Sequence, residues 1–301
     1  MSVSIIIVSY NTKDLLKDCL NSLIASQTGD YDIWIVDNAS TDGSADMVES
    51  DYPNVNLIRS TKNLGFGRAN NLAALKSDAD YIMLLNPDTV LTCDLLGPMV
   101  RYLEEHPEVG VVGPKVLWPD GDIQLSCELF PTIKYELAWQ VRSTFLDKLF
   151  KPDRLIEHVR MQDCNHDVSM PVQFLWATCW LVRRQVIDET GLFDETFRLY
   201  DEDLDFCARL ARTQWQAHYL PSVSLIHIGG MSSTSLGKAI MMRKGRSLYY
   251  RIHRGIFYAL AYKLLMFGSG MLKMTRHALL GLVSHEHWSR AKTHFHLAIR
   301  R

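Results

Sequence analysis

The stretch from Tyr81 to Val90, YIMLLNPDTV, places the tightest constraint on how this chain folds. Its apolar run, Tyr81 to Leu85, ends abruptly at Asn86, Pro87 and Asp88. An apolar run bounded by turn residues predicts a strand buried on both faces of a parallel sheet. Pro87 cannot continue a strand ladder, so the chain must leave the sheet there. Asp88 is therefore expected at the carboxyl end of a strand, where open α/β sheets bind their ligands.

Two interpretations of Asp88 follow from the tripeptide alone. A carboxylate fixed at such a sheet edge suits a hard divalent cation that carries a diphosphate. An ordinary turn with a solvated Asp explains the same letters, because short motifs recur by chance. The neighbouring segments decide between the two.

Strand and helix patterns alternate upstream of Asp88. Strands are predicted over residues 2–9, 32–36 and 55–60, each followed by a polar turn and a helical segment. This alternation predicts a parallel, right-handed, doubly wound sheet. The first turn, Ser9 to Thr12, has no glycine, so the dinucleotide-binding fingerprint is missing and a nicotinamide or flavin enzyme is disfavoured.

Composition narrows the class of protein. With 301 residues, 47% of them hydrophobic and 22% charged, the chain is expected to fold around a sizeable core. The 6 cysteines are scattered without a Cys-x-x-Cys pair, which argues against a zinc knuckle or a disulfide framework and fits a reducing cytosol. Residues 1–10 lack a basic start and a cleavage site, so they indicate a first strand rather than a signal peptide.

Charge is distributed unevenly along the chain. Residues 243–301 hold 12 Lys or Arg and a single acid, Glu286, for a net +11, whereas the remainder carries −13. Such a basic tail is expected to meet phosphates, in lipid headgroups or in nucleic acid. It has no aromatic platform and no reading motif, so nucleic acid is disfavoured.

The apolar part of the tail, Ile256 to Leu272, carries Lys263 and a Gly-Ser-Gly break. It is too short to cross a bilayer, which takes about 20 apolar residues. Basic flanks favour an amphipathic segment lying in an anionic membrane interface. The alternative is a helix that packs back on the rest of the chain or on a dimer partner.

Four segments carry a resemblance to a known family: SIIIVSYNT, VDNASTDGS, NLGFGRANN and LLNPDT. In this order and spacing they resemble the nucleotide-sugar half of a family 2 glycosyltransferase, above all the bacterial rhamnosyltransferase-like branch that builds cell-surface polysaccharides. The similarity continues through GPKVLWPDGDIQLSC, FLWATCWLVRR, GLFDETFRLYDEDLDFCARL and LIHIGGMSS, and so covers about the first four-fifths of the chain.

The resemblance implies an α/β protein with the GT-A fold, a Rossmann-like and mostly parallel central sheet flanked by helices. We expect a glycosyltransferase domain over residues 1–242, with a nucleotide-sugar half at about 1–115 and an acceptor half at about 116–242. Residues 243–301 are expected to form a basic, helical, membrane-associating tail. The resemblance further implies a nucleotide-sugar donor, a Mg²⁺ or Mn²⁺ ion, and inversion at the anomeric carbon.

Donor-binding residues are carried over position by position. Asp37 is expected to accept the ring N–H of a uracil or thymine base, although a cap for the following helix is the alternative. Ser9 and Asn11 are expected to line the same pocket, more through backbone than side chain. The other positions expected to bind the nucleotide sugar are Asn38, Lys62, Asn63, Gly65 and Asn86.

The resemblance also suggests metal ligands and a base. Asp88 is the expected metal ligand. It ends a motif that is Asp-x-Asp in the wider family and has Asn86 in its first position here, as is common in this branch. His227 is a further candidate ligand, against the alternative of an ordinary core histidine. In the acidic run DEDLD, the resemblance makes Asp203 the catalytic base. A charged helix start alone would explain only one or two of these acids.

The acceptor side is less sharply defined. Glu202 and Asp205 are expected to hold the acceptor or the local structure. Residues 174–184 are expected to form the wall of the sugar pocket, with Trp176 and Thr178 facing it.

The combined prediction is an inverting, metal-dependent hexosyltransferase. It would move L-rhamnose from dTDP-rhamnose to a hydroxyl of a polyprenyl-diphosphate-linked or growing glycan, as in lipopolysaccharide or cell-wall biosynthesis. It would act in the bacterial cytoplasm as a peripheral protein on the inner membrane face. UDP-GlcNAc, UDP-galactose or UDP-galactofuranose is the alternative donor, and a non-catalytic nucleotide-sugar-binding scaffold is the alternative class. A homodimer is left open.

Overall fold

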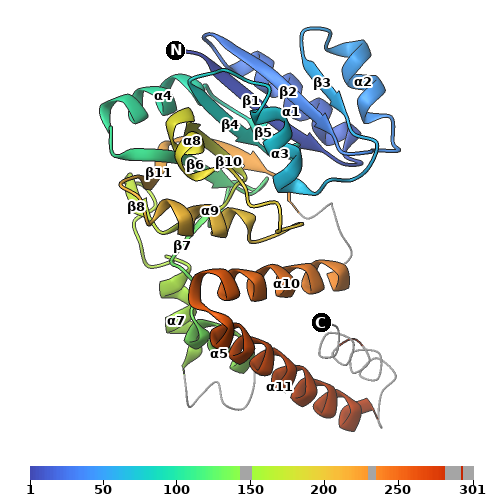
Figure 1. The fold of residues 1–301 in the computed structure, drawn as a ribbon, viewed down its shortest axis with the longest axis vertical. Helices are drawn as coiled ribbons and strands as arrows, with labels where there is room; N and C mark the ends of the chain where they lie inside the picture. The colour runs from blue at the N-terminus through green and yellow to red at the C-terminus, as the bar shows by residue number, and fades with distance from the viewer. Residues whose placement is uncertain (143–150, 230–234, 282–292, 294–301) are drawn as a thin grey trace. The chain divides into compact units, whose positions relative to one another are not determined.

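The protein is described here by a computed structural model that covers residues 1–142, 151–229, 235–281 and 293. Contacts group the chain into two compact units (Figure 1). The sheet unit comprises residues 1–130 and 160–232, and the helical unit comprises residues 131–159 and 233–301. The helical unit thus draws residues 131–159 from the middle of the chain. The expected division into a glycosyltransferase domain over residues 1–242 and a tail over residues 243–301 stays a prediction.

The first half of the sheet unit alternates strand and helix as expected. Strands β1, β2, β3 and β4 are mutually parallel and lie in the order β3-β2-β1-β4. The elements are β1 (Val3–Ser9), α1 (Lys13–Ser26), β2 (Tyr31–Asp37), α2 (Ser44–Asp51), β3 (Asn56–Arg59), α3 (Phe66–Ala74) and β4 (Tyr81–Leu85). The α/β class and the mostly parallel sheet are confirmed.

The second half of the sheet unit extends the same sheet to β4-β10-β6-β11-β5, and β8 pairs with β11. Its elements are β5 (Thr89–Leu91), α4 (Leu96–Glu105), β6 (Val109–Leu117), β7 (Cys127–Glu128), β8 (Met170–Val172), β9 (Phe174–Leu175), β10 (Cys179–Arg183), α8 (Arg184–Thr190), α9 (Glu202–Leu210) and β11 (Gln216–His227). Strand β10 runs antiparallel between β4 and β6. Part of the segment expected to form the sugar-pocket wall is therefore a central strand.

Alternate residues of the sheet point to opposite faces, and each face has its own apolar cover. On one face, Ile5 and Ile7 of β1 belong to the same buried cluster as Leu16 and Leu20 of α1. On the other face, the ring of Trp180 in β10 lies 6.0 Å from Phe193 and 5.2 Å from Phe206 of α9, measured between centroids. Trp180 is thus a core residue.

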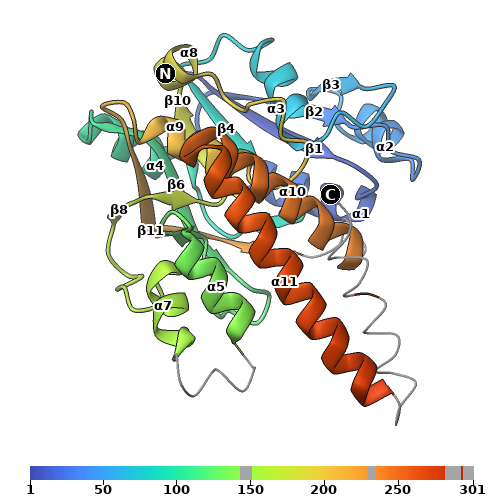
Figure 2. The same cartoon turned by 60° about the horizontal axis from the view of Figure 1, so that its bottom comes forward.

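The helical unit consists of α5 (Ile133–Val141), α7 (Pro152–Val159), α10 (Ser235–Arg254) and α11 (Ile256–Gly281) (Figure 2). The Glu136 carboxylate of α5 accepts hydrogen bonds from Arg246, at 2.7 Å, and from the Tyr250 hydroxyl, at 3.0 Å. These bonds join α5 to α10. Across the described residues, no helix is both long and apolar enough to cross a membrane. The predicted helical character of the tail is confirmed as far as residue 281.

Candidate active site at the carboxyl edge of the sheet

Asp37 lies at the end of β2, directly opposite Ser9 of β1 in the strand register. Both residues are buried. One carboxylate oxygen of Asp37, Oδ2, accepts the backbone N–H of Ser40 at 3.2 Å. The other, Oδ1, is buried and has no hydrogen-bond partner within the described part of the chain. A buried oxygen without a donor is costly, so this atom calls for an N–H or O–H group from a ligand.

The loops beyond β1 and β2 are tied together by Asn11. Its Oδ1 accepts the backbone N–H of Thr41 at 2.7 Å, and its own N–H donates to Ser40 Oγ at 3.0 Å. Asn11 and Ala39 both adopt positive φ angles, of 53° and 66°. Backbone strain of this kind gathers at ligand-binding sites. Asn11 thus holds the two loops together, and its expected place in the lining of the donor pocket stays a prediction.

Asn38 and Asn63 hold the glycine turn after β3. Asn38 Oδ1 accepts the Leu64 N–H at 2.7 Å, and its Nδ2 donates to the Gly65 carbonyl at 3.2 Å. Asn63 Oδ1 accepts the Gly65 N–H at 2.9 Å. Their side chains therefore build the turn, and their expected contacts with the nucleotide sugar stay predictions.

Gly65 has a φ of +86°, and a Cβ placed on it would lie 2.2 Å from the carbonyl oxygen of Arg198. The close approach that this glycine permits is made by the chain's own backbone, and its expected role in binding the donor stays a prediction. Lys62, by contrast, is exposed on the same turn. Its ammonium group has no hydrogen-bond or ion-pair partner among the described residues, so it is available to a ligand phosphate.

The two expected metal ligands lie side by side. Strand β5 pairs with the end of β11 so that Thr89 faces His227, and Ile228 N–H donates to the Asp88 carbonyl at 2.9 Å. This pairing leaves His227 Nε2 3.2 Å from Asp88 Oδ1. Both side chains are largely but not fully buried.

Gln124 is a site residue that the sequence did not reveal. Its Oε1 lies 2.7 Å from His227 Nδ1. With a cation bound at Nε2, Nδ1 would carry the ring proton and donate it to this oxygen. The segment GDIQLSC gives no signal for this role, because Gln124 reaches His227 only through the fold. The described residues hold no cluster of three or more His, Cys, Asp or Glu that would complete a cation site. An ion here would take its remaining oxygen ligands from a bound phosphate or from water.

The turn before Asp88 is fixed to the segment that carries Trp176 and Thr178. Asn86 N–H donates to the Thr178 carbonyl at 3.0 Å, and Trp176 N–H donates to the Ser126 carbonyl at 2.7 Å. Between them, Ala177 N–H donates to Asp203 Oδ2 at 3.3 Å. Ala177 and Thr178, adjacent in the chain, thus connect the expected base to the Asn86 turn.

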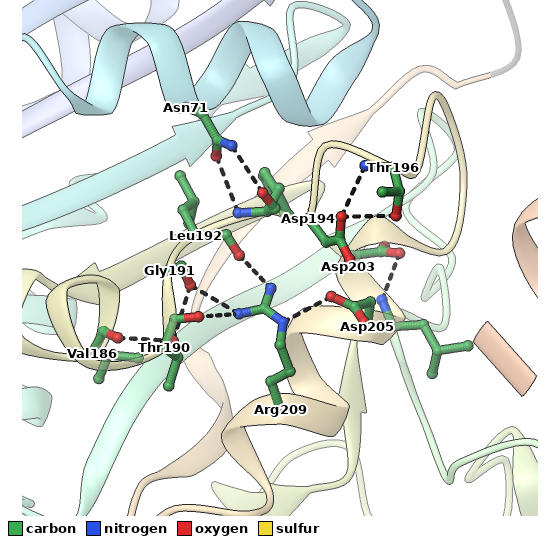
Figure 3. A network of polar contacts seen from close by, with 12 residues as sticks. Asn71, Val186, Thr190, Gly191, Leu192, Asp194, Thr196, Asp203, Asp205 and Arg209 are labelled. Carbon is green, nitrogen blue, oxygen red and sulfur yellow. Dashed lines mark hydrogen bonds and ion pairs between the residues drawn. The ribbon is translucent and has the colours of Figure 1, made fainter. Parts of the chain in front are cut away.

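Asp203 lies in the first turn of α9, and its Oδ1 accepts the Leu204 N–H at 2.9 Å (Figure 3). Burial, with a smaller contribution from Asp201, raises the pKa of the Asp203 carboxyl to about 6. Burial and the neighbouring Asp203 raise the pKa of Glu202 well above its usual range. Glu202 Oε2 is buried without a hydrogen-bond partner in the described chain. The two residues that directly precede this turn, Tyr200 and Asp201, have positive φ angles of 70° and 67°.

Asp205 has a different environment from Asp203. It is buried and accepts the Arg209 Nε–H at 2.8 Å (Figure 3). The same guanidinium donates to the carbonyls of Thr190, Gly191 and Leu192. Of the two roles expected for Asp205, these contacts support the one in the local structure.

Sequence comparison identifies the class to which this fold and site belong. The family described as Glycosyl transferase family 2 matches residues 4–191, more than half of the chain. The chain therefore belongs to glycosyltransferase family 2, and it is a glycosyltransferase.

Two curated relatives carry rhamnosyltransferase names. The chain is 28% identical over 239 residues to N-acetylglucosaminyl-diphospho-decaprenol L-rhamnosyltransferase of Mycobacterium tuberculosis, covering 74% of this chain and 75% of the relative. It is 27% identical over 235 residues to rhamnosyltransferase WbbL of Escherichia coli, covering 75% and 83%. The expected similarity to the rhamnosyltransferase-like branch is confirmed.

Solved structures agree on the fold. A mannosyltransferase from Pyrobaculum calidifontis, solved with GDP-Man and Mn²⁺, matches with a TM-score of 0.57 at 14% identity, covering 99% of this chain and 76% of that one. S. aureus TarS matches with a TM-score of 0.53 at 13% identity, covering 99% and 90%. At such identities the likeness supports the GT-A fold alone.

Proposed function

We propose that the protein is an inverting, metal-dependent glycosyltransferase that moves L-rhamnose from dTDP-rhamnose to a hydroxyl of a polyprenyl-diphosphate-linked or growing surface glycan. The observation that carries this proposal is the 3.2 Å contact between Asp88 and His227 at the carboxyl edge of the sheet. An oxygen and a nitrogen ligand that converge at this place suit a divalent cation bound to a nucleoside diphosphate. Such an ion would neutralise the departing diphosphate.

The donor pocket supports the nucleotide part of the proposal. The unpaired Oδ1 of Asp37 has the chemistry to accept the imide N–H of a thymine or uracil ring. The exposed ammonium of Lys62, on a neighbouring turn, offers a positive charge for a phosphate. A uracil base would satisfy Asp37 equally well, so dTDP and UDP donors are distinguished by the donor panel below.

Asp203 supplies the base. The acceptor oxygen forms a bond to the anomeric carbon while the bond from that carbon to the diphosphate oxygen breaks, and the diphosphate leaves with the electron pair. The acceptor's proton passes to Asp203, whose pKa of about 6 leaves it charged at neutral pH yet more basic than a solvated Asp. The Ala177 and Leu204 N–H groups hold the carboxylate in place. A non-catalytic scaffold would have no need for this base.

The names of two relatives support rhamnose as the sugar, and one of them supports a lipid-linked acceptor. One relative is named for transfer of L-rhamnose to N-acetylglucosaminyl-diphospho-decaprenol. We propose a related acceptor here, met at the inner face of the bacterial cytoplasmic membrane, with cell-surface polysaccharide as the product.

The test is donor hydrolysis, measured as nucleoside diphosphate released from dTDP-rhamnose, UDP-GlcNAc, UDP-galactose and UDP-galactofuranose with Mn²⁺ or Mg²⁺. We expect metal-dependent release from dTDP-rhamnose, and the Asp88→Ala variant should lose the metal dependence. Release from a UDP-sugar alone would reject rhamnose and keep the chemistry. If no donor is hydrolysed and none of the nucleotides binds in calorimetry, the proposed function is wrong.

A further inference from the structure

Helix α11 exposes a continuous apolar face to solvent. The exposed fractions are 84% for Phe257, 70% for Leu264 and 75% for Leu272. Leu260 and Phe267, between them, are exposed as well. The spacing of three to five residues places all five on one side of the helix, which we call the outer face.

The opposite side of α11 is already occupied. Ala259, Tyr262 and Met266 are buried. Further along the same side, Ser269 Oγ and Lys273 Nζ donate to Gln140 Oε1 of α5 at 2.7 and 3.0 Å. The helix is therefore apolar on both sides, although only one side packs against described residues of the helical unit. A helix that is apolar all round is normally covered all round, and the part of the chain that the structure describes offers the outer face no partner.

The charge of this region indicates what covers the outer face. Residues 235–281 contain 9 Lys or Arg and no Asp or Glu. Arg251 and Arg254, just before α11, and Lys263 within it are exposed. A second copy of the chain would bring two strongly basic surfaces together. An anionic lipid surface instead supplies both an apolar interior for the outer face and phosphates for the cations.

We propose that the outer face of α11 inserts into the interface of an anionic phospholipid bilayer, with the helix lying in the membrane plane. Phe257, Leu264 and Leu272 enter the acyl boundary, and Arg251, Arg254 and Lys263 meet headgroup phosphates. This proposal names the surface that would bring the enzyme to its lipid-linked acceptor. It does not depend on the donor or on the transfer chemistry, because binding is measured without substrate.

The test is flotation of the full chain with vesicles of phosphatidylcholine alone or mixed with phosphatidylglycerol. The double variant Phe257→Glu/Leu264→Glu should lower the partition coefficient on the anionic vesicles about tenfold or more, since it removes two inserted side chains. Leu75→Glu is the matched control: Leu75 is 85% exposed in the sheet unit, and its replacement should leave flotation unchanged. Equal thermal midpoints of parent and variants establish that each variant is folded.

Three outcomes would overturn the proposal. The first is that the parent fails to float with anionic vesicles, and the second is that the double variant floats as well as the parent. The third is that sedimentation finds a parent dimer that the double variant converts to monomer while vesicle binding stays the same, which would make a second copy the partner. None of these outcomes affects donor hydrolysis, so the two proposals stand or fall separately.

Discussion

The turn after β4 and the first turn of α9 both bring carboxylates to the candidate site, but they place them by different means. After β4 a single carboxylate, Asp88, leaves the sheet at a strand end and meets His227 at 3.2 Å. At the start of α9, several acids follow one another along the chain, and their side chains separate. Asp203 is held by the N–H groups of Ala177 and Leu204, whereas Asp205 is buried against Arg209.

Local geometry explains this difference. A strand that ends at a sheet edge delivers the next residue to that edge, so the position of Asp88 in the chain largely determines its place. A helix turns by about 100° per residue, so residues 203 and 205 point about 200° apart. Acids two residues apart in a helix therefore meet different neighbours, and only those neighbours decide which one acts on a substrate.

The largest expected effect comes from Asp203→Asn, which removes the proposed base and keeps the shape. We expect transfer to fall by about 10²–10⁴-fold while nucleotide binding persists. In the parent, kcat/KM should decrease as the pH falls below about 6, because the base is then protonated. Steady-state kinetics across pH and nucleotide titration measure both effects. Full turnover by the variant would remove Asp203 from catalysis.

Asp205→Asn should lower the stability of the protein and leave transfer almost unchanged. It breaks a buried ion pair and leaves Arg209 without its partner, so we expect a loss of about 3–5 kcal/mol in unfolding free energy. Transfer per folded molecule should change little at a temperature where the variant is folded. Urea unfolding alongside kinetics measures the two quantities.

Asp203→Asn provides the matched comparison for stability. The folded state raises the pKa of Asp203 from its usual 3.8 to about 6, so the fold loses stability as the pH rises through this interval and bears the full penalty at neutral pH. Removing that charge should therefore leave stability at neutral pH unchanged or higher. If Asp203→Asn is the more destabilising of the two, the roles assigned to these neighbours are reversed.

The sequence predicts those features that depend on local pattern. The four parallel strands, the end of β4 at Asn86 and the position of Asp37 follow from apolar runs and the turns that bound them. Strand β10 could not be assigned, because a short apolar run such as CWLVR fits several structures until its partners are known. The roles of Gly65 and Asp205 depend on Arg198 and Arg209, and the packing of α5 with α10 depends on Glu136. These are contacts between distant residues that no local pattern encodes.

The smallest expected effect concerns Gln124, the distant residue that contacts His227 beside the turn after β4. Gln124→Leu removes the acceptor for His227 Nδ1–H, so the ring loses its fixed tautomer and orientation. We expect Mn²⁺ affinity in the presence of dTDP to weaken by about 10–100-fold, as is typical when the hydrogen-bond partner of a metal-binding histidine is lost.

Gln216→Leu is the control, because Gln216 makes a similar contact, 3.0 Å to His218 Nε2, at the start of β11. Electron paramagnetic resonance of free Mn²⁺ measures both. Equal affinities for the two variants would mean that Gln124 does not position His227 for the ion.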